Sequence, residues 1–572
     1  MIIVENKINK NNIFVNDVIV IITMAVIVVS LIYGWQGMHS SFNGYSLPEL
    51  SMRYSALPYY TLRTTMRLLV GLFYSVIFSI VFAVLAAKYT PMRRVILPFV
   101  NFMESVPLVG FLTFTTAFFL GLYPHSVMGL ESLAIFAVFT AQAWNMMLTI
   151  YQTLRVVPQE LTEATQVFHY NPWQRFWRLE FLYSFPGLLW NTMVSQSAAW
   201  FALIASEMLT VGAGSTNLPG VGSYIGIALQ NGNVSDVVYG VLALIANIII
   251  FDQLLFRPLV RYAHQFKYED ISEKKTPTSW FYYCLSHSHT GYVLGRACKW
   301  LSLLWLFSIP KIWYALKFDR LFFLLSEMNW LWSGVWYMSI VVSCVYYFHK
   351  LWIYIPKEYL VSIPGWMGMT AARVIIAMIL SVIIFTPLGV WIGLRPKLVR
   401  LFQPLIQIFA AVPANVFYPL IAFMIVFWHQ DLNTWTVPMI MLGTQWYILF
   451  NVIAGTSMIP SQMKEVSEAF HLKGLLWWTK FILPAVFPYI VTGVISAAGG
   501  AWNTAIAAEV LNWGKIKLQT NGLGAFISIA SDIGNNPQEA LGCVAMCFMV
   551  MLCIIFVWQP MYHYAENRYK FD

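Results

Sequence analysis

Apolar runs of about 20 residues recur along this chain, and each is long enough to cross the hydrocarbon core of a membrane as a helix. Backbone amides find no hydrogen-bond partners in lipid, so each run must satisfy its own bonds by forming a helix. Charged residues make up only 10% of the 572 residues, whereas a soluble domain carries about 25%. A chain so poor in charge cannot cover a water-exposed surface. The sequence therefore predicts an all-α polytopic membrane protein.

We expect about twelve transmembrane helices, six in each half of the chain. In the first half they lie near residues 14–35, 62–87, 95–121, 130–152, 184–211 and 236–256. In the second half they lie near residues 330–349, 370–394, 401–428, 434–456, 486–511 and 538–559. Pro107 and Pro413 should kink the third helix of each half.

The stretch between the halves, residues 257–299, is too charged to span a membrane, and we expect it to be a cytoplasmic linker. The segment 299–318 that follows is apolar but contains Pro310 and Lys311. A spanning helix in this segment would invert the second half relative to the first. We therefore expect the segment to lie along the cytoplasmic membrane interface.

Basic residues indicate which loops are cytoplasmic. Lys7 and Lys10 precede the first apolar run, and Lys88, Arg93 and Arg94 follow the second. Because Lys and Arg collect on the cytoplasmic side, we expect the N-terminus, the even-numbered loops and the C-terminus to lie there. The same bias accounts for the net charge of +9, so contact with membrane lipid is expected and binding to nucleic acid is not.

Cofactor and metal motifs are weak in this sequence. The six cysteines give no disulfide framework. Cys284, His287, His289 and Cys298 could be drawn as a metal site, but their irregular spacing favours a plain loop, so no metal is expected. The chain has no G-x-x-x-x-G-K-[ST] pattern, which is the usual cradle for ATP phosphates. We therefore expect this chain to bind no cofactor.

The two halves match each other at a fixed offset. Arg67 has its counterpart 306 positions later in Arg373, and Glu207 has its counterpart 302 positions later in Glu509. Other pairs at the offset of 302 are Pro158 and Pro460, Glu163 and Glu465, His169 and His471, and Trp200 and Trp502. A short indel between Pro107 and Pro158 explains the change of offset. A parallel repeat of this kind is related by an axis along the membrane normal, which places a path between the halves.

Each half carries the same motif between its fourth and fifth apolar runs, at residues 157–186 and 459–488. A proline opens the motif, and we expect a Glu in the first helical turn, where the helix dipole favours a carboxylate. These features predict a short amphipathic helix in a cytoplasmic loop, then a second helical piece that enters the membrane. One copy alone would be an ordinary interfacial helix. Two copies at one offset favour a lever that acts on the membrane helices.

The motif resembles the EAA loop of binding-protein-dependent ABC importer permeases, in which Glu-Ala-Ala is followed by three residues and Gly, and after nine more residues by Ile-x-Leu-Pro. Residues 163–165, Glu-Ala-Thr, match its start in the first half, and Leu483-Pro484 match its end in the second. The Gly position is His169 in one half and His471 in the other. The resemblance extends over residues 60–260 and 370–565 and is closest to fused two-permease members of the nitrate, sulfonate, taurine and bicarbonate branch. Shorter pieces that look like those fused proteins are 218–223, 443–451 and 499–503.

This resemblance implies two tandem type I permease domains in a bacterial inner membrane, and a small anion of the nitrate, sulfonate or bicarbonate type as solute. Each loop would dock onto a separate ABC ATPase subunit that holds ATP and Mg²⁺, so this chain would not be an enzyme. A periplasmic substrate-binding protein is a further implied partner. The docking residues carried over are Glu163, Ala164, His169, Arg175, Glu465, Glu468, Ala469, His471 and Gly474. The implied parts are an N-terminal helix and outer loop (1–60), the first permease domain (61–262), a cytoplasmic linker (263–329), a helix and outer loop (330–369) and the second permease domain (370–572).

Matched charges inside the apolar runs are candidates for the translocation path. Carboxylates in a membrane face a cavity or a partner, so Glu207 and Glu509 either line the path or cap backbone near Gly212 and Gly514. The candidate path or gate residues are Glu207, Glu509, Trp200, Trp502, Asn503, Arg67 and Arg373. The two arginines could instead snorkel to the headgroups. An ion-coupled secondary transporter that uses the paired Glu residues, and a scaffold without transport, are the alternative functions.

Overall fold

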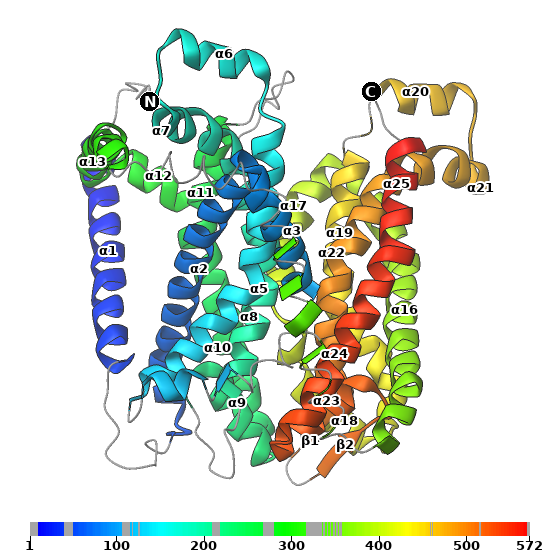
Figure 1. Ribbon diagram of the computed structural model, residues 1–572. Coiled ribbons are helices and arrows are strands. Elements are labelled where there is room, and N and C mark those ends of the chain that lie inside the picture. The colour runs from blue at the N-terminus through cyan, green and yellow to red at the C-terminus, as the bar shows by residue number, and fades with distance from the viewer. Residues whose placement is uncertain are drawn as a thin grey trace.

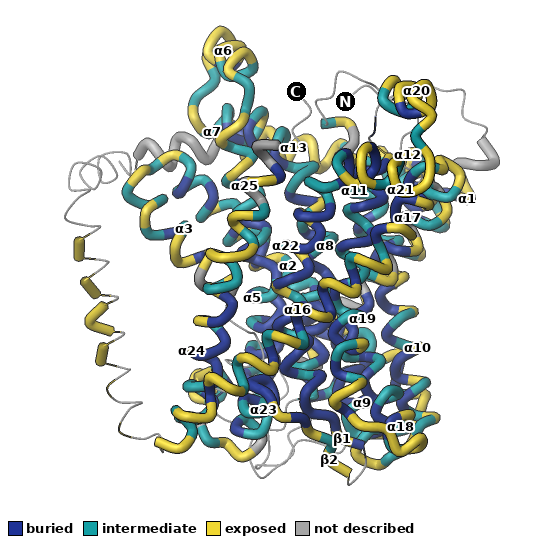
Figure 2. Tube along the Cα trace, turned by 90° about the vertical axis from the view of Figure 1, so that its right-hand side faces the viewer, coloured by how far each residue is buried: buried dark blue, intermediate teal, exposed yellow. Residues whose placement is uncertain are grey.

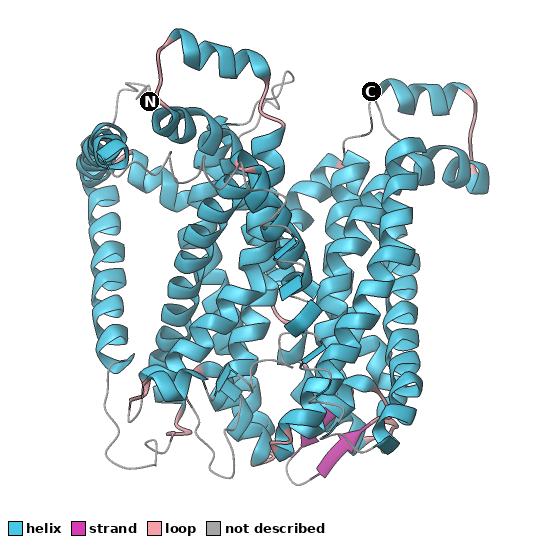
Figure 3. Ribbon diagram, in the orientation of Figure 1, coloured by secondary structure: helices cyan, strands magenta, loops and turns pink. Residues whose placement is uncertain are grey.

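The computed structural model describes residues 10–38, 50–105, 126–208, 218–266, 279–315, 357–457, 461–513 and 516–568, with short pieces within 115–123 and 334–353 and at 459. Long helices run side by side between the two ends of the molecule (Figure 1). The short helices α6 (Gln159–Val167) and α20 (Ser461–Ala469) project from one end, and a two-stranded hairpin lies at the other (Figure 3). The predicted all-α polytopic class is confirmed.

The first half and the linker form one series of helices. Apart from single 3₁₀ turns, these are α1 (Lys10–Met38), α2 (Leu57–Lys88), α3 (Thr90–Ser105), α5 (Met128–Arg155), α6, α7 (Pro172–Arg175), a π-helical turn (Phe176–Glu180), α8 (Phe181–Met208), α9 (Val221–Gln230), α10 (Val234–Phe251), a second π-helical turn (Asp252–Phe256), α11 (Arg257–Ala263), α12 (Trp280–Ser286) and α13 (His289–Ala315). Within this half α2 packs against α5, and α5 packs against α8.

The second half repeats this order. Its elements are α16 (Lys357–Gly393), α17 (Pro396–Ala411), a 3₁₀ turn (Ala414–Val416), α18 (Tyr418–Phe427), α19 (Leu432–Ser457), α20, α21 (Gly474–Trp477), a π-helical turn (Trp478–Ile482), α22 (Leu483–Ala508), β1 (Val510–Trp513), β2 (Ile516–Gln519), α23 (Leu523–Ile533), α24 (Asn536–Cys553), a second π-helical turn (Ile554–Trp558) and α25 (Gln559–Arg568). Here α16 packs against α19, and α19 packs against α22.

The bounds of these helices reproduce the two offsets found in the sequence. The bounds of α6, α7 and α10 coincide with those of α20, α21 and α24 at 302 positions, and those of α3 coincide with α17 at 306 positions. Even the two π-helical turns recur at 302 positions. A π turn inserts one extra residue into a helix and is uncommon, so its recurrence at matched sites is strong evidence that both halves share one architecture.

Eight of the described helices are long and apolar enough to cross a membrane, judged by length and composition. They lie within 14–36, 54–88, 128–155, 234–263, 357–393, 432–457, 474–508 and 537–561. Most of the helix expected near 330–349 falls outside the described residues. Buried residues gather along the helices in the middle of the molecule, whereas α6 and α20 are largely exposed (Figure 2).

Several details differ from the prediction. The helix expected at 401–428 is two helices, because α17 ends at Ala411 and Pro413, which lacks an amide donor, precedes the 3₁₀ turn that leads to α18. Pro413 therefore ends a helix rather than kinking one, while Pro107 lies outside the described residues. The outer loop expected before residue 370 is helical from Lys357. The hairpin of β1 and β2 was not predicted.

The linker is more ordered than the sequence suggested, since α12 and α13 replace the plain loop expected at residues 284–298. Figure 1 views α13 end-on while α1 stands lengthwise, so α13 lies crosswise to α1. The interfacial position expected for residues 299–318 stays a prediction, and residues 316–318 lie outside the described part of the chain. Asp17 of α1 fixes the start of α13, because its carboxylate accepts hydrogen bonds from the Thr290 amide at 2.8 Å and hydroxyl at 2.7 Å. Among the described residues, no three His, Cys, Asp or Glu side chains are placed to hold a metal ion.

Candidate docking loops and translocation path

Two docking loops, residues 159–180 and 461–482, have the same geometry. Each begins with a nine-residue helix and continues through a four-residue helix and a π-helical turn into a long membrane helix, α8 or α22. Because the four-residue helix, the π turn and the long helix are contiguous, displacement of the short helix can be transmitted along the long one. Figure 1 shows both loops at the same end of the molecule.

His169 and His471 end the first helix of each docking loop in the left-handed region, both with φ of 51°. The amides after them close the helix end, with Tyr170 donating to the Thr165 carbonyl at 3.0 Å and Leu472 donating to its counterpart at 3.1 Å. A left-handed residue at this position is the common way to end a helix, and glycine is the usual residue there. The histidines therefore preserve the helix end that the glycine of the EAA pattern would give.

Most of the predicted docking residues lie on the outside of these loops. The exposed ones are Glu163, Ala164, His169, Glu465, Glu468, Ala469, His471 and Gly474. Arg175 is different, because it is only partly exposed and its Nε lies 2.9 Å from a carboxylate oxygen of the buried Glu180. The first-turn Glu was correctly predicted only for α6, which has Glu160 there; α20 has no acidic residue in its first turn.

The linker helix α13 contacts the first docking loop. The indole Nε1 of Trp173 donates a hydrogen bond of 3.1 Å to the carbonyl of Trp305, and the rings of Trp173 and Trp177 both lie against the Trp305 ring. The counterparts of Trp173 and Trp177 in the second loop are Leu475 and Thr479, and both are exposed. The linker thus braces one docking loop by contacts that the described part of the second loop does not make.

A buried charge network occupies the opposite end of the first half. Arg67 of α2 lies 2.5 Å from a carboxylate oxygen of Glu207 on α8 and 2.6 Å from one of Glu131 on α5. Arg63, one turn before Arg67, also pairs with Glu131. The four side chains are at most 2% exposed. Two positive and two negative charges therefore neutralise each other where burial of an unpaired charge would cost several kcal/mol.

The Glu207 carboxylate also holds the start of α9. It accepts a hydrogen bond of 2.8 Å from the Gly222 amide and one of 2.9 Å from the Thr64 hydroxyl. The Thr64 oxygen in turn accepts one of 3.0 Å from the Val221 amide. These two amides belong to the first turn of α9, which has no partners within the helix for its amides. A Cβ on Gly220 would overlap the Glu207 carboxylate, so glycine is required there.

The second half repeats this arrangement with fewer charges. Arg373 lies 2.9 Å from Glu509, and Glu509 accepts hydrogen bonds from the Thr370 hydroxyl at 2.8 Å and the Ala525 amide at 3.0 Å. Thr370 accepts one of 2.8 Å from the amide of Leu523, the first residue of α23. Gly212 and Gly514, near which a cap was expected, lie outside the described residues, and the amides that these carboxylates bind follow Gly220 and Gly522.

The position of Glu131 marks a paired exchange between the halves. Its counterpart 302 positions later is Asn433, whose side-chain oxygen accepts a hydrogen bond of 3.0 Å from Arg373. The counterpart of Arg63 at the offset of 306 is Met369. One acid and one base have thus been replaced together, which leaves each network neutral. Because Glu131 and Asn433 match at the offset of 302, the indel between the halves lies between Pro107 and Glu131.

The remaining predicted path residues lie on α8 and α22. Trp200 and Trp502 are buried at matched positions, and their indole nitrogens have no hydrogen-bond partner. Asn503 is partly exposed, and its amide donates to the Gly499 carbonyl at 3.2 Å. The structure brings Arg67 to Glu207 and Arg373 to Glu509 but does not place the two Glu residues together.

A contact between the halves was not predicted. The Tyr447 hydroxyl of α19 hydrogen-bonds the Ser197 hydroxyl of α8 and donates to the Val194 carbonyl at 3.3 Å. The Tyr447 ring lies beside Gly500, where a Cβ would be in ordinary van der Waals contact with it at 3.9 Å. The repeat counterparts of Tyr447 and Ser197 are Asn145 and Gly499. The sequence shows only that a polar side chain lies in an apolar helix of each half. The fold shows that these two side chains contact each other.

Comparison with known proteins places these features in a family. The chain belongs to the family of binding-protein-dependent transport system inner membrane components, which matches residues 79–257 and again residues 385–571. Members of this family are translocation subunits rather than enzymes. The double match confirms the predicted pair of permease domains.

Individual relatives include ABC importer permeases with different printed solutes. A nitrate import permease protein from Leptolyngbya laminosa is 29% identical over 174 residues, which is 30% of this chain and 58% of that protein. A bicarbonate transport system permease protein from Synechococcus elongatus is 29% identical over 150 residues, covering 26% of this chain and 50% of that protein. A taurine transport system permease protein from Escherichia coli is 25% identical over 171 residues, covering 29% and 58%. This chain thus spans about half the length of these relatives in each match.

Proposed function

We propose that this chain forms the whole membrane path of an ATP-driven importer, with ATP and Mg²⁺ held by two separate ATPase subunits. The observation that carries the proposal is the pair of docking loops. Their helices and π-helical turns begin and end at positions 302 residues apart, and each has a left-handed His at the end of its first helix. A duplicated surface of this kind suits two copies of a partner related by the same axis. Docking would use the exposed faces of α6 and α20, including Glu163 and Glu465.

Movement would pass from the docking loops into the membrane along α8 and α22. Each of these helices carries, at its far end, the carboxylate that pairs with α2 or α16 and caps α9 or α23. These buried ion pairs would keep each half rigid, since breaking one exposes an uncompensated charge. Each half would then move as a body, and the weaker polar contacts between the halves would change.

The contact of Ser197 with Tyr447 lies where such a change would open or close the path. Its hydrogen bonds join α8 of one half to α19 of the other. Nearer the docking loops, the rings of Trp190 and Phe450 contact each other across the same boundary in a tilted arrangement, with centroids 4.9 Å apart. We assign Tyr447 a role in gating, whereas Glu207 and Glu509 would support the path from outside it.

The solute would be a small anion brought by a periplasmic substrate-binding protein. This part rests on the relatives, whose printed solutes are nitrate, bicarbonate and taurine. The docking loops would face the cytoplasm of a bacterial cell, together with the start of α1 and the end of α25, which Figure 1 places at the same end. Basic residues at the ends of α2 and α7 agree with this orientation.

The alternative of an ion-coupled secondary transporter receives no support from the family. It also conflicts with the contacts of Glu207 and Glu509, because a carboxylate that exchanges protons with the path would need access to it. Both side chains are fully buried and paired with arginine.

Charge reversal in the docking loops tests the proposal. In a complex of this chain with its ATPase, Glu163→Lys together with Glu465→Lys should uncouple ATP hydrolysis from uptake. Reversal at the exposed Glu358 of α16, outside both loops, is a matched control that should leave uptake unchanged. Normal uptake in the double variant would refute the docking assignment.

A further inference from the structure

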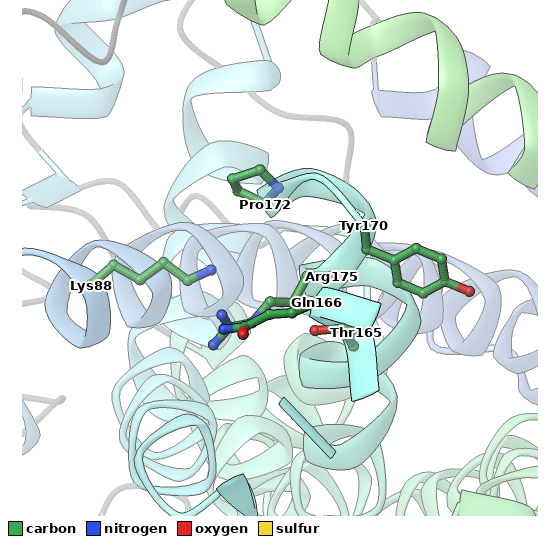
Figure 4. Close-up of a pocket in the computed structure, with 6 residues that line it drawn as sticks. All are labelled: Lys88, Thr165, Gln166, Tyr170, Pro172 and Arg175. Atoms are coloured by element: carbon green, nitrogen blue, oxygen red, sulfur yellow. The ribbon is translucent and has the colours of Figure 1, made fainter. Parts of the chain in front are cut away.

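A pocket of about 330 Å³ lies beneath the first docking loop and has no role in the account so far. It is lined by Lys88, Thr165, Gln166, Tyr170, Pro172 and Arg175 (Figure 4). Lys88 is the last residue of α2, and Arg175 is the last residue of α7. The pocket therefore lies at the joint between the docking loop and a membrane helix.

Two cations of this pocket share one carboxylate. The Lys88 ammonium and the Arg175 Nε each lie 2.9 Å from an oxygen of Glu180, whose side chain is 6% exposed. The two basic side chains are 35% and 37% exposed, and Figure 4 shows them extending toward each other. Glu180 itself is not part of the pocket lining. One unit of positive charge is therefore left uncompensated at the pocket wall.

The free donors on Arg175 suit an oxyanion. Its Nε lies 2.9 Å from a Glu180 oxygen as an ion pair but makes no hydrogen bond, and no hydrogen bond of its two terminal nitrogens is found among the described residues. The planar guanidinium presents these N–H groups side by side, and that spacing matches two oxygens of a carboxylate, sulfate or phosphate. The Lys88 ammonium carries three N–H donors, and no hydrogen bond from it to Glu180 is formed, since the facing Glu180 oxygen has no hydrogen-bond partner.

The second half shows that this cluster is not needed to build a docking loop. The counterparts of Lys88, Arg175 and Glu180 are Leu394, Trp477 and Ile482. Ile482 is completely buried in the hydrophobic core of the second half, and Leu394 and Trp477 are partly buried and pack against that core. The second docking loop nevertheless keeps the same helix bounds and the same left-handed His. Because an apolar joint serves the fold equally well, and burial of Glu180 has a desolvation cost, the charges call for a separate explanation.

We propose that the pocket binds a small oxyanion from the cytoplasm, held by the Arg175 fork and the Lys88 ammonium. The bound anion would tie the first docking loop to the end of α2 and restrain its movement. Only one of the two loops would respond, so the anion would act on one half of the transporter. Binding depends only on residues of this chain, whereas the effect on transport rests on the proposed function.

Anion binding can be measured on the purified full chain in lipid nanodiscs without any ATPase. Sodium sulfate is titrated at constant ionic strength, with sodium chloride as the replaced salt, and binding is followed by calorimetry. The test variant, Lys88→Leu with Arg175→Trp and Glu180→Ile, introduces the second half's own side chains and lowers the net charge by one. Lys480→Leu lowers the net charge equally at an exposed side chain of the second loop.

We expect sulfate to bind the natural chain and the Lys480→Leu control alike, and to bind the triple variant about tenfold or more weakly because two charge-assisted contacts are lost. Arg175→Lys, which keeps the charge but removes the fork, should weaken binding severalfold and tests the proposal even if the triple variant fails to fold. Equal sulfate affinity in the natural chain and Arg175→Lys would overturn it. Absence of sulfate binding to the natural chain would also overturn it. If ATPase docking nevertheless depended on Lys88, Arg175 and Glu180, the pocket would be a site for a carboxylate of the ATPase instead.

Discussion

Arg67 and Glu207 form an ion pair of 2.5 Å between α2 and α8, and neither side chain has any exposed surface. Because the same carboxylate caps α9, one residue joins three helices of the first half. Arg373 and Glu509 repeat the pair at 2.9 Å in the second half. We therefore propose that the matched charges hold each half together.

Removing one partner of this pair should destabilise the protein strongly. Glu207→Ala removes one of the two carboxylates that balance Arg63 and Arg67, which leaves one buried positive charge without a partner. We therefore expect a loss of about 3–5 kcal/mol in the free energy of unfolding. The measurement is thermal unfolding in detergent together with the yield of folded protein. Glu163→Ala, at an exposed position, is the control and should change stability little. Normal folding of Glu207→Ala with loss of transport would instead place Glu207 in the path.

The exchange between the halves gives a second prediction. Glu131→Asn alone leaves Arg63 and Arg67 with a single carboxylate. Arg63→Met combined with Glu131→Asn introduces the residues found at the matched positions of the second half and makes the network neutral again. The double variant should be more stable than Glu131→Asn by about 1–3 kcal/mol. A double-mutant cycle of unfolding free energies measures this coupling. Additive effects of the two substitutions would contradict the exchange.

The sequence revealed the repeat and the matched charges but did not pair them. Arg67 and Glu207 are 140 positions apart, and neither hydropathy nor spacing says which helix packs against which. An alignment of the halves does hold a signal, since Arg63 and Glu131 change together to Met369 and Asn433. Such a joint loss of opposite charges indicates contact.

Backbone geometry was less accessible to sequence reasoning. The Glu207 carboxylate lies against Gly220, 13 positions further along the chain, and a contact over this separation has no signature in the sequence. Pro413 predicts a kink but separates α17 from α18, since a proline in the sequence does not tell how far a helix is interrupted. The contact of Tyr447 with Ser197 joins different halves, and periodicity within one helix carries no information on it.

The left-handed histidines give a third prediction. Glycine adopts φ of 51° without strain, so His169→Gly should preserve docking of the ATPase. Valine is strained there because its branched side chain crowds the backbone, so His169→Val should weaken docking and loosen the end of α6. Hydrogen exchange of the loop amides and ATPase binding measure both effects. Equal behaviour of the two variants would show that the left-handed end is unimportant.

The contact between the halves gives a fourth prediction. Tyr447→Phe removes the hydroxyl that bonds Ser197 but keeps the ring beside Gly500. A net loss of about 0.5–1.5 kcal/mol shifts an equilibrium between two conformations by severalfold, with little effect on folding. The populations can be followed by electron paramagnetic resonance between spin labels on α6 and α20. Unchanged populations in both Tyr447→Phe and Ser197→Ala would exclude a gating role for this contact.

The central claim is that this chain is moved by ATPase subunits docked on its two repeated loops, and gentle detergent purification of the tagged chain from its native membranes tests it most directly. Mass spectrometry should then identify a stoichiometric ABC-type ATPase, and the ATPase should be lost when both loops are altered at Glu163 and Glu465. Absence of any such ATPase, under conditions that keep other membrane complexes intact, would contradict the account.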